Sequence, residues 1–167
     1  MSELCCECRA PCSWSPDTGD AAARLTMQRE AMLVLNAVNH MEGQRELESG
    51  GAENRRLERV EAKLDLALYL LARGLAAGAP ATPRPIRLEA SKVEWEDASP
   101  PAMGAAVVLE VVLSDSLPLP VRLPGEASAA RDGVARMRFS GFIPELEDAL
   151  YQFIFRRHRQ AIRSRGN

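Results

Sequence analysis

The most concentrated reactive side chains in the sequence are four cysteines, Cys5, Cys6, Cys8 and Cys12. Four thiolates can complete the tetrahedral ligand set of a zinc ion. Structural zinc sites usually combine two well-separated ligand pairs, and this run offers no second pair. We therefore predict that the cysteines bind no metal. We place them in a flexible arm, residues 1–19, because that segment carries Cys, Pro, Ser, Asp and Gly without a periodic pattern.

Catalytic motifs are missing from the sequence. It contains no Gly-rich phosphate loop, no HExxH zinc motif and no GxSxG nucleophile motif. The two histidines, His40 and His158, have no evident nucleophile or carboxylate partner along the chain. We predict that the protein is not an enzyme and needs no cofactor.

Arginines gather near the C-terminus, in the stretch FRRHRQAIRSR. Such a stretch can contact the phosphates of a nucleic acid. However, the whole chain has a net charge of −2, and the arginines stand at the end of a predicted helix, where they complement its dipole. We predict that the protein does not bind DNA.

No apolar run reaches the roughly 18 residues that a membrane-spanning helix needs. The first residues, MSELCCECRAPCSW, also lack the charged start and long apolar core of a signal peptide. We expect a cytoplasmic protein that does not associate with membranes.

The first predicted secondary-structure elements of the chain are helices. A heptad pattern of apolar residues runs through residues 53–75, at Leu57, Val60, Leu64, Ala67 and Leu71. Spacings that alternate between three and four residues are typical of a helix that packs against another helix. This pattern predicts that these five residues mediate oligomerisation.

The second half of this helix, residues 66–75, is apolar on nearly every side. A two-stranded coiled coil cannot bury such a surface, and each buried Leu contributes about 1.5–3 kcal/mol. Three partners remain open: a higher-order bundle, a preceding helix at residues 20–41 folded back at Gly50-Gly51, or a neighbouring barrel. We assign residues 20–78 to a helical oligomerisation region and expect a homo-oligomer, with a tetramer favoured.

After a linker at residues 79–84, the apolar period changes from helical to two. A final helix starts at Pro144, a favourable first position. The predicted strands are short and separated by turn residues, which suggests a small antiparallel barrel. They cover residues 86–88, 93–95, 105–113, 121–123 and 133–139. The predicted fold class is α+β: N-terminal helices, then a barrel with a C-terminal helix at residues 85–167.

Three stretches in order carry a further signal: PIRLEASKVEWE at 85–96, AAVVLEVVLSDSLPLPVRLPG at 105–125 and ARMRFSGFIPELEDALYQFIFRRHRQ at 135–160. Together they resemble a PilZ domain over residues 83–162. The resemblance implies a six-stranded β-barrel of the kind that commonly binds the bacterial second messenger cyclic di-GMP. The added heptad helix resembles a tetrameric PilZ subgroup of plant-pathogenic bacteria, in which helices assemble the oligomer.

The ligand motifs of that family are RxxxR at the start of the domain and (D/N)xSxxG on the early strands. Here only Ser91 matches the second motif, since Glu89 and Glu94 stand where Asp or Asn and Gly are expected. Arg84 and Arg87 are one residue too close to form the first motif. Arginine forks bind phosphate and guanine edges, so their loss should weaken binding. Any ligand contact should therefore come from Ser91, Arg84 and Arg87.

Two functions remain open. The first is a non-enzymatic signalling or scaffold protein, which acts through protein partners and binds cyclic di-GMP weakly or not at all. The second is a true cyclic di-GMP receptor that uses non-standard residues such as Arg84, Arg87 or the cluster between Arg156 and Arg159.

Overall fold

The computed structural model of the protein describes residues 4–43, 81–115 and 117–165. It also describes nine helical residues of the predicted heptad segment: Arg56, Leu57, Val60, Glu61, Lys63, Leu64, Leu66, Ala67 and Leu70.

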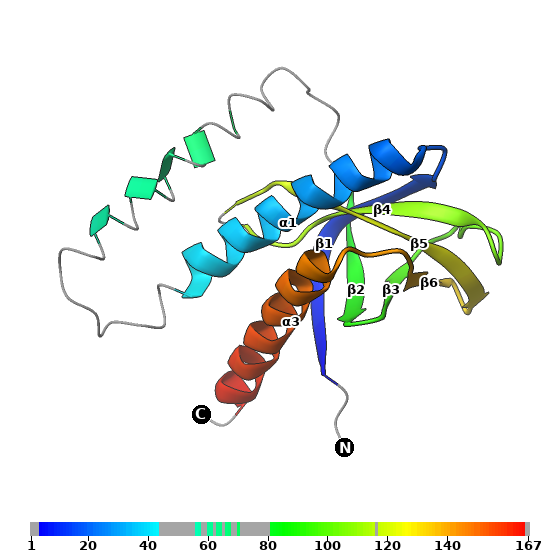
Figure 1. Ribbon diagram of the computed structural model, residues 1–167. Helices are drawn as coiled ribbons and strands as arrows, with labels where there is room; N and C mark the ends of the chain where they lie inside the picture. Colours follow the sequence, from blue (N-terminus) through cyan, green and yellow to red (C-terminus); the bar gives the residue numbers. More distant parts are fainter. Residues whose placement is uncertain are drawn as a thin grey trace.

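Six antiparallel strands form a closed barrel (Figure 1). Around the barrel they follow the order β1-β2-β3-β6-β5-β4. Their bounds are β1 Cys5–Pro16, β2 Pro83–Glu89, β3 Lys92–Glu96, β4 Ala106–Val112, β5 Pro120–Arg131 and β6 Val134–Phe139. The predicted α+β class, with a six-stranded barrel flanked by helices, is confirmed.

Strand β1 corrects the prediction of a flexible arm at residues 1–19. Cys5–Pro16 pairs with β2 along its first half, and with β4 along its second half, where Trp14 lies opposite Leu109. Cys6, Ala10 and Cys12 are buried, so they alternate with exposed residues as a half-buried strand requires. The segment lacks the β-branched residues that usually mark a strand, because buried cysteines take their place as small apolar side chains. The barrel therefore does not begin at residue 85.

Helix α1, Ala21–Gly43, lies across the barrel and contacts both β5 and the C-terminal helix α3, Pro144–Arg165 (Figure 1). Asp20 caps its N-terminus, because Asp20 Oδ1 accepts a hydrogen bond of 2.8 Å from the Ala23 amide. Its buried face consists of Met27, Gln28, Ala31, Val34, Leu35 and Val38. This apolar face is thus occupied within the chain, although the sequence assigned it to the oligomerisation region.

Helix α3, Pro144–Arg165, packs on α1 and on β1. The predicted start of this helix at Pro144 is confirmed. Its apolar stripe is buried and consists of Leu146, Ala149, Leu150, Phe153 and Ile154. The start of β1 and the last turns of α3 lie at the same end of the molecule (Figure 1), where His158 Nδ1 stands 3.1 Å from the Cys5 carbonyl oxygen.

The helical residues between 56 and 70 present apolar side chains to solvent. Leu57, Val60 and Leu64 are exposed by 66%, 58% and 61%, and Ala67 is exposed as well. Leu66 alone of the nine is partly buried, against the core of the molecule. Leu71, the last of the predicted heptad residues, lies outside the described residues. The heptad prediction stays a prediction, but its described members are free for a partner.

Candidate functional site

Ser91 lies in the tight turn between β2 and β3, and its side chain is exposed. The Ser91 carbonyl oxygen accepts a hydrogen bond of 2.9 Å from the Phe139 amide, at the end of β6. This bond holds the turn against the neighbouring strand. Ser91 therefore lies in the β2–β3 turn, next to the end of β6, and its assignment to the family motif stays a prediction.

Arg87 is held by carboxylates. Its Nε lies 3.0 Å from Glu89 Oε1, and its other arm lies 3.3 Å from Glu7 on β1. Its pKa is raised, first by the hydrogen bond to Glu89 and then by the charges nearby. Glu89 is 7% exposed and also pairs with Lys92 at 3.2 Å. Glu89, which stands where the motif has Asp or Asn, therefore forms ion pairs with both Arg87 and Lys92.

Arg84 is held at a second site. It lies 2.9 Å from Asp97 Oδ2, just after β3, and donates a 3.3 Å hydrogen bond to the Glu96 carbonyl. Since Arg84 and Arg87 are three residues apart on one strand, their side chains point to opposite faces of it. The structure does not bring the two predicted arginines together.

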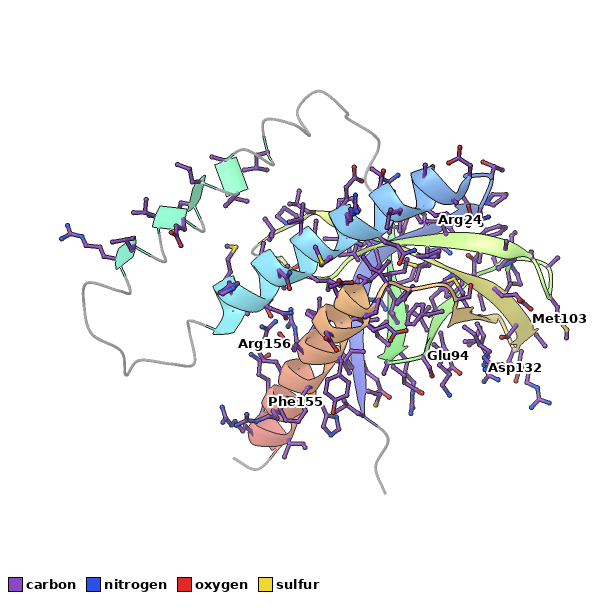
Figure 2. All side chains as sticks on the ribbon, viewed as in Figure 1. Arg24, Glu94, Met103, Asp132, Phe155 and Arg156 are labelled. Atoms are coloured by element: carbon purple, nitrogen blue, oxygen red, sulfur yellow. The ribbon has the colours of Figure 1, made fainter. Side chains whose placement is uncertain are left out.

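Glu94, which stands where the motif has Gly, also forms an ion pair. It lies 2.9 Å from Arg136, its register partner on β6 (Figure 2 labels Glu94). A glycine would leave the strand surface open at this point, whereas the Glu94–Arg136 pair covers it.

A pocket of about 420 Å³ lies beside Ser91. Its wall is formed by the β2–β3 turn, the loop after β6 and the first turns of α3. The lining residues are Ala90, Ser91, Phe139, Ser140, Gly141, Phe142, Glu147, Asp148 and Tyr151. Neither Arg84 nor Arg87 lines this pocket. The sequence did not indicate that Glu147, Asp148 and Tyr151 lie near Ser91, because they are far from it along the chain and belong to no motif that includes it.

The cysteines of β1 belong to the fold. A hydrogen bond from the Cys6 thiol lowers the pKa of Cys8 to about 7. Burial acts in the opposite direction on Cys8, whereas the charge of Arg157 lowers its pKa further. The same hydrogen bond raises the pKa of Cys6. Burial raises the pKa of Cys12 to about 12. Among the described residues no three His, Cys, Asp or Glu side chains are placed to hold a metal ion.

The arginines of α3 also have partners inside the molecule. Arg156 and Arg157 pair with Glu42 at 3.1 and 2.8 Å, and Ser114 donates a further hydrogen bond to the same carboxylate (Figure 2 labels Arg156). Arg156 also donates to the Asn39 carbonyl, and Arg157 to the Leu113 carbonyl. Two cations of the predicted surface cluster therefore join α3 to α1 and to the segment after β4.

A family model described as "Atypical PilZ domain, cyclic di-GMP receptor" matches residues 32–165. Among solved structures, the chain is similar to a pathogenic protein of Xanthomonas campestris, described as a tetrameric PilZ domain self-assembled via an unusual helical bundle. The identity is 25%, the TM-score is 0.74, and the match covers 96% of this chain and 91% of the other. No curated protein matches the chain significantly.

In the described part of the chain, no helix is long and apolar enough to cross a membrane.

Proposed function

The chain belongs to the atypical PilZ domain family, and on that basis we propose that it is a non-enzymatic signalling protein of the cytoplasm. It assembles through its helical segment, acts through protein partners, and binds cyclic di-GMP weakly or not at all. One observation carries the proposal: both arginines near the motif turn are paired with carboxylates, Arg87 with Glu89 and Arg84 with Asp97.

The energetic argument starts from the ligand. Cyclic di-GMP is a dianion, and each charge-assisted hydrogen bond to it would contribute about 1.5–3 kcal/mol. A micromolar complex has a total binding free energy of only about 8 kcal/mol. To contact the ligand, Arg87 must first leave Glu89, a nearly buried carboxylate that would then lose one of its two cations. The glutamates at 89 and 94 also add negative charge beside the phosphates.

Calorimetric titration of the full chain with cyclic di-GMP tests this part of the proposal. We expect no saturable heat below roughly 100 μM ligand. A dissociation constant below 1 μM would contradict the proposal. The Glu89→Gln/Glu94→Gly variant serves as the comparison, because it removes the two added charges and should bind more tightly than the natural chain if the argument is correct.

The oligomer is proposed from two observations. Leu57, Val60 and Leu64 are exposed along one helical segment, and the similar Xanthomonas protein is described as a tetramer assembled by a helical bundle. We place Ala67 and Leu71 in the same interface. Burial of each exposed Leu would contribute about 1.5–3 kcal/mol, so four copies supply a stable core.

Light scattering on the full chain tests the assembly, with four copies as the expected mass. The Leu57→Asp/Leu64→Asp variant should be monomeric, whereas Arg59→Gln, at a heptad position away from the predicted seam, should keep the mass unchanged. A truncation before residue 82 is not suitable, because it would remove β1 from the barrel. A monomeric natural chain would refute the oligomer proposal.

The second candidate is a true cyclic di-GMP receptor, which the description of the family favours. The Arg87 side chain is 40% exposed and could exchange partners. This candidate predicts saturable binding that is lost in Arg87→Ala and retained in Arg131→Ala, an exposed arginine on β5 that pairs with Val134, at the other end of β6 from the Ser91 turn.

A further inference from the structure

We propose that the pocket beside Ser91 binds an arginine or lysine side chain of a partner protein, through the carboxylates of Glu147 and Asp148 and the aromatic rings around them. The inference rests on the proposed function, since it names the surface by which a barrel with few ligand residues would contact its partner. The position of the family's ligand turn would thus be reused for a cation in place of a dianion.

The pocket is built from three elements that the fold holds in place. The Ser91 carbonyl is bonded to Phe139, which fixes the turn against β6. The loop after β6 is held from α1, because Gln28 donates to the Gly141 carbonyl at 2.9 Å and accepts from the Ile143 amide at 2.7 Å. Gln28 is 5% exposed, so these bonds are sheltered from water. The walls are therefore largely preformed, which lowers the entropic cost of binding.

The charged side chains that line the pocket are all negative. Its lining contains two carboxylates, Glu147 and Asp148, and no Lys, Arg or His. Within residues 4–43, 81–115 and 117–165, neither carboxylate forms an ion pair, and both side chains are exposed. Such a lining repels phosphate and attracts a guanidinium or an ammonium group.

Aromatic rings supply the second contact. Phe139 and Phe142 stack with ring centres 4.9 Å apart. Tyr151 is 52% exposed and stacks on Phe155, with ring centres 6.3 Å apart. Ring faces attract cations, and arginine stacks on them while its donors reach a carboxylate. The pocket therefore combines the two chemical features that recognise an arginine.

Acidic residues in the first turns of a helix also complement its dipole, and this role alone would explain Glu145 and Glu147. The two roles differ in position. Glu145 shares the dipole role but does not line the pocket, whereas Asp148 lines it. Glu145→Gln is therefore a matched control for Glu147→Gln and Asp148→Asn.

The test is an NMR titration of the full-length, ¹⁵N-labelled protein with the blocked tripeptide acetyl-Gly-Arg-Gly-amide. We expect saturable shifts of the Ser91, Gly141 and Asp148 amides. The neutral analogue with citrulline in place of arginine should give none. Glu147→Gln and Asp148→Asn should each weaken binding about two- to fivefold, the effect of one exposed ion pair, and Glu145→Gln should leave it unchanged.

Three outcomes would overturn the inference. Equal shifts with the citrulline peptide would remove the charge argument. Unchanged affinity in Glu147→Gln and Asp148→Asn would place the peptide elsewhere. A loss of oligomer mass in these variants, measured by light scattering, would assign the pocket to a second copy of this chain. Tight binding of cyclic di-GMP would refute the proposed function separately, because that titration does not use the peptide.

Discussion

The indole of Trp14 donates a hydrogen bond of 3.1 Å to Oδ2 of Asp97, 83 residues later in the chain. The same oxygen accepts the indole of Trp95 at 3.1 Å and lies 2.9 Å from Arg84. One carboxylate thus joins β1, β2 and the end of β3. It explains why Arg84, a candidate ligand residue by sequence, is part of the scaffold.

Removal of the charge at Asp97 should therefore destabilise the barrel. Asp97→Asn keeps the shape of the side chain but replaces charge-assisted bonds from two indoles and a guanidinium with weaker ones. We expect a loss of roughly 1–3 kcal/mol in the free energy of unfolding, measured by urea denaturation. Asp132→Asn, an exposed residue in the turn after β5, should change it by less than about 0.5 kcal/mol. Equal losses in the two variants would show that the Asp97 carboxylate and its hydrogen bonds do not stabilise the fold.

The Asp97 carboxylate should also make the free energy of unfolding depend on pH in the acidic range. Burial tends to raise the pKa of Asp97, but hydrogen bonds from the Ser99 amide and both indoles, together with Arg84, outweigh it and hold the pKa below its usual range. Its contribution is therefore complete above the unfolded pKa of about 3.9 and is lost as pH falls through the lower folded value. Unfolding free energies measured from pH 6 down to pH 2 should fall less steeply in Asp97→Asn than in the natural chain.

Glu42 should be a second point of weakness. Its side chain is 11% exposed and faces Arg156 and Arg157. In Glu42→Gln these two guanidiniums would face each other across a neutral amide, at a cost of about 2–4 kcal/mol. Glu30→Gln is the matched control, because Glu30 pairs with Arg122 at the surface, and its loss should cost less than about 1 kcal/mol. A thermal denaturation series that ranks the two variants equally would contradict the buried-pair account.

Cys8 should be the more reactive thiol when compared with Cys12. Its pKa is about 7 and it is partly exposed, whereas Cys12 is buried with a pKa of about 12. Iodoacetamide reacts with thiolates, so peptide mapping by mass spectrometry should find Cys8 modified first, at a rate that rises between pH 6 and 8. Cys6→Ala removes the main cause of the low pKa and should move this rise to higher pH. Faster labelling of Cys12 at pH 7 would refute the assignment.

Much of the fold could be predicted from local pattern. The α+β class, the start of α3 at Pro144 and the existence of five strands after residue 82 follow from apolar spacing and turn residues, which act over a few positions. The length of β5 does not, because the predicted strand at 121–123 continues to Arg131. The predicted strands at 86–88 and 93–95 also placed Ser91 in a turn, and it lies between β2 and β3. These features need no knowledge of the rest of the chain, because the backbone bonds that define them close locally.

Strand β1 is the clearest feature that local pattern hid. A run of Cys, Pro and Ser has low strand propensity, and it becomes a strand because β2 and β4 offer paired edges to it. The five strands after residue 82 leave an open barrel, and only a segment from the far end of the chain closes it. That requirement follows from backbone hydrogen bonding across the whole sheet. A short stretch of sequence carries no information about it.

The sequence by itself determined which residues this protein has in place of the family's ligand motifs: Glu89 and Glu94 around Ser91, and arginines at the wrong spacing. Only the tertiary structure decided what those residues do. It paired Arg87 with Glu89 and Arg84 with Asp97, and it brought Glu147 and Asp148 to the pocket of Ser91. The physical reason is that electrostatic pairing depends on separation in space. Arg87 and Glu89 meet because residues two positions apart on a strand share a face, and Arg84 meets Asp97 because β2 pairs with β3. Glu147 and Asp148 reach Ser91 only when α3 packs against the closed barrel.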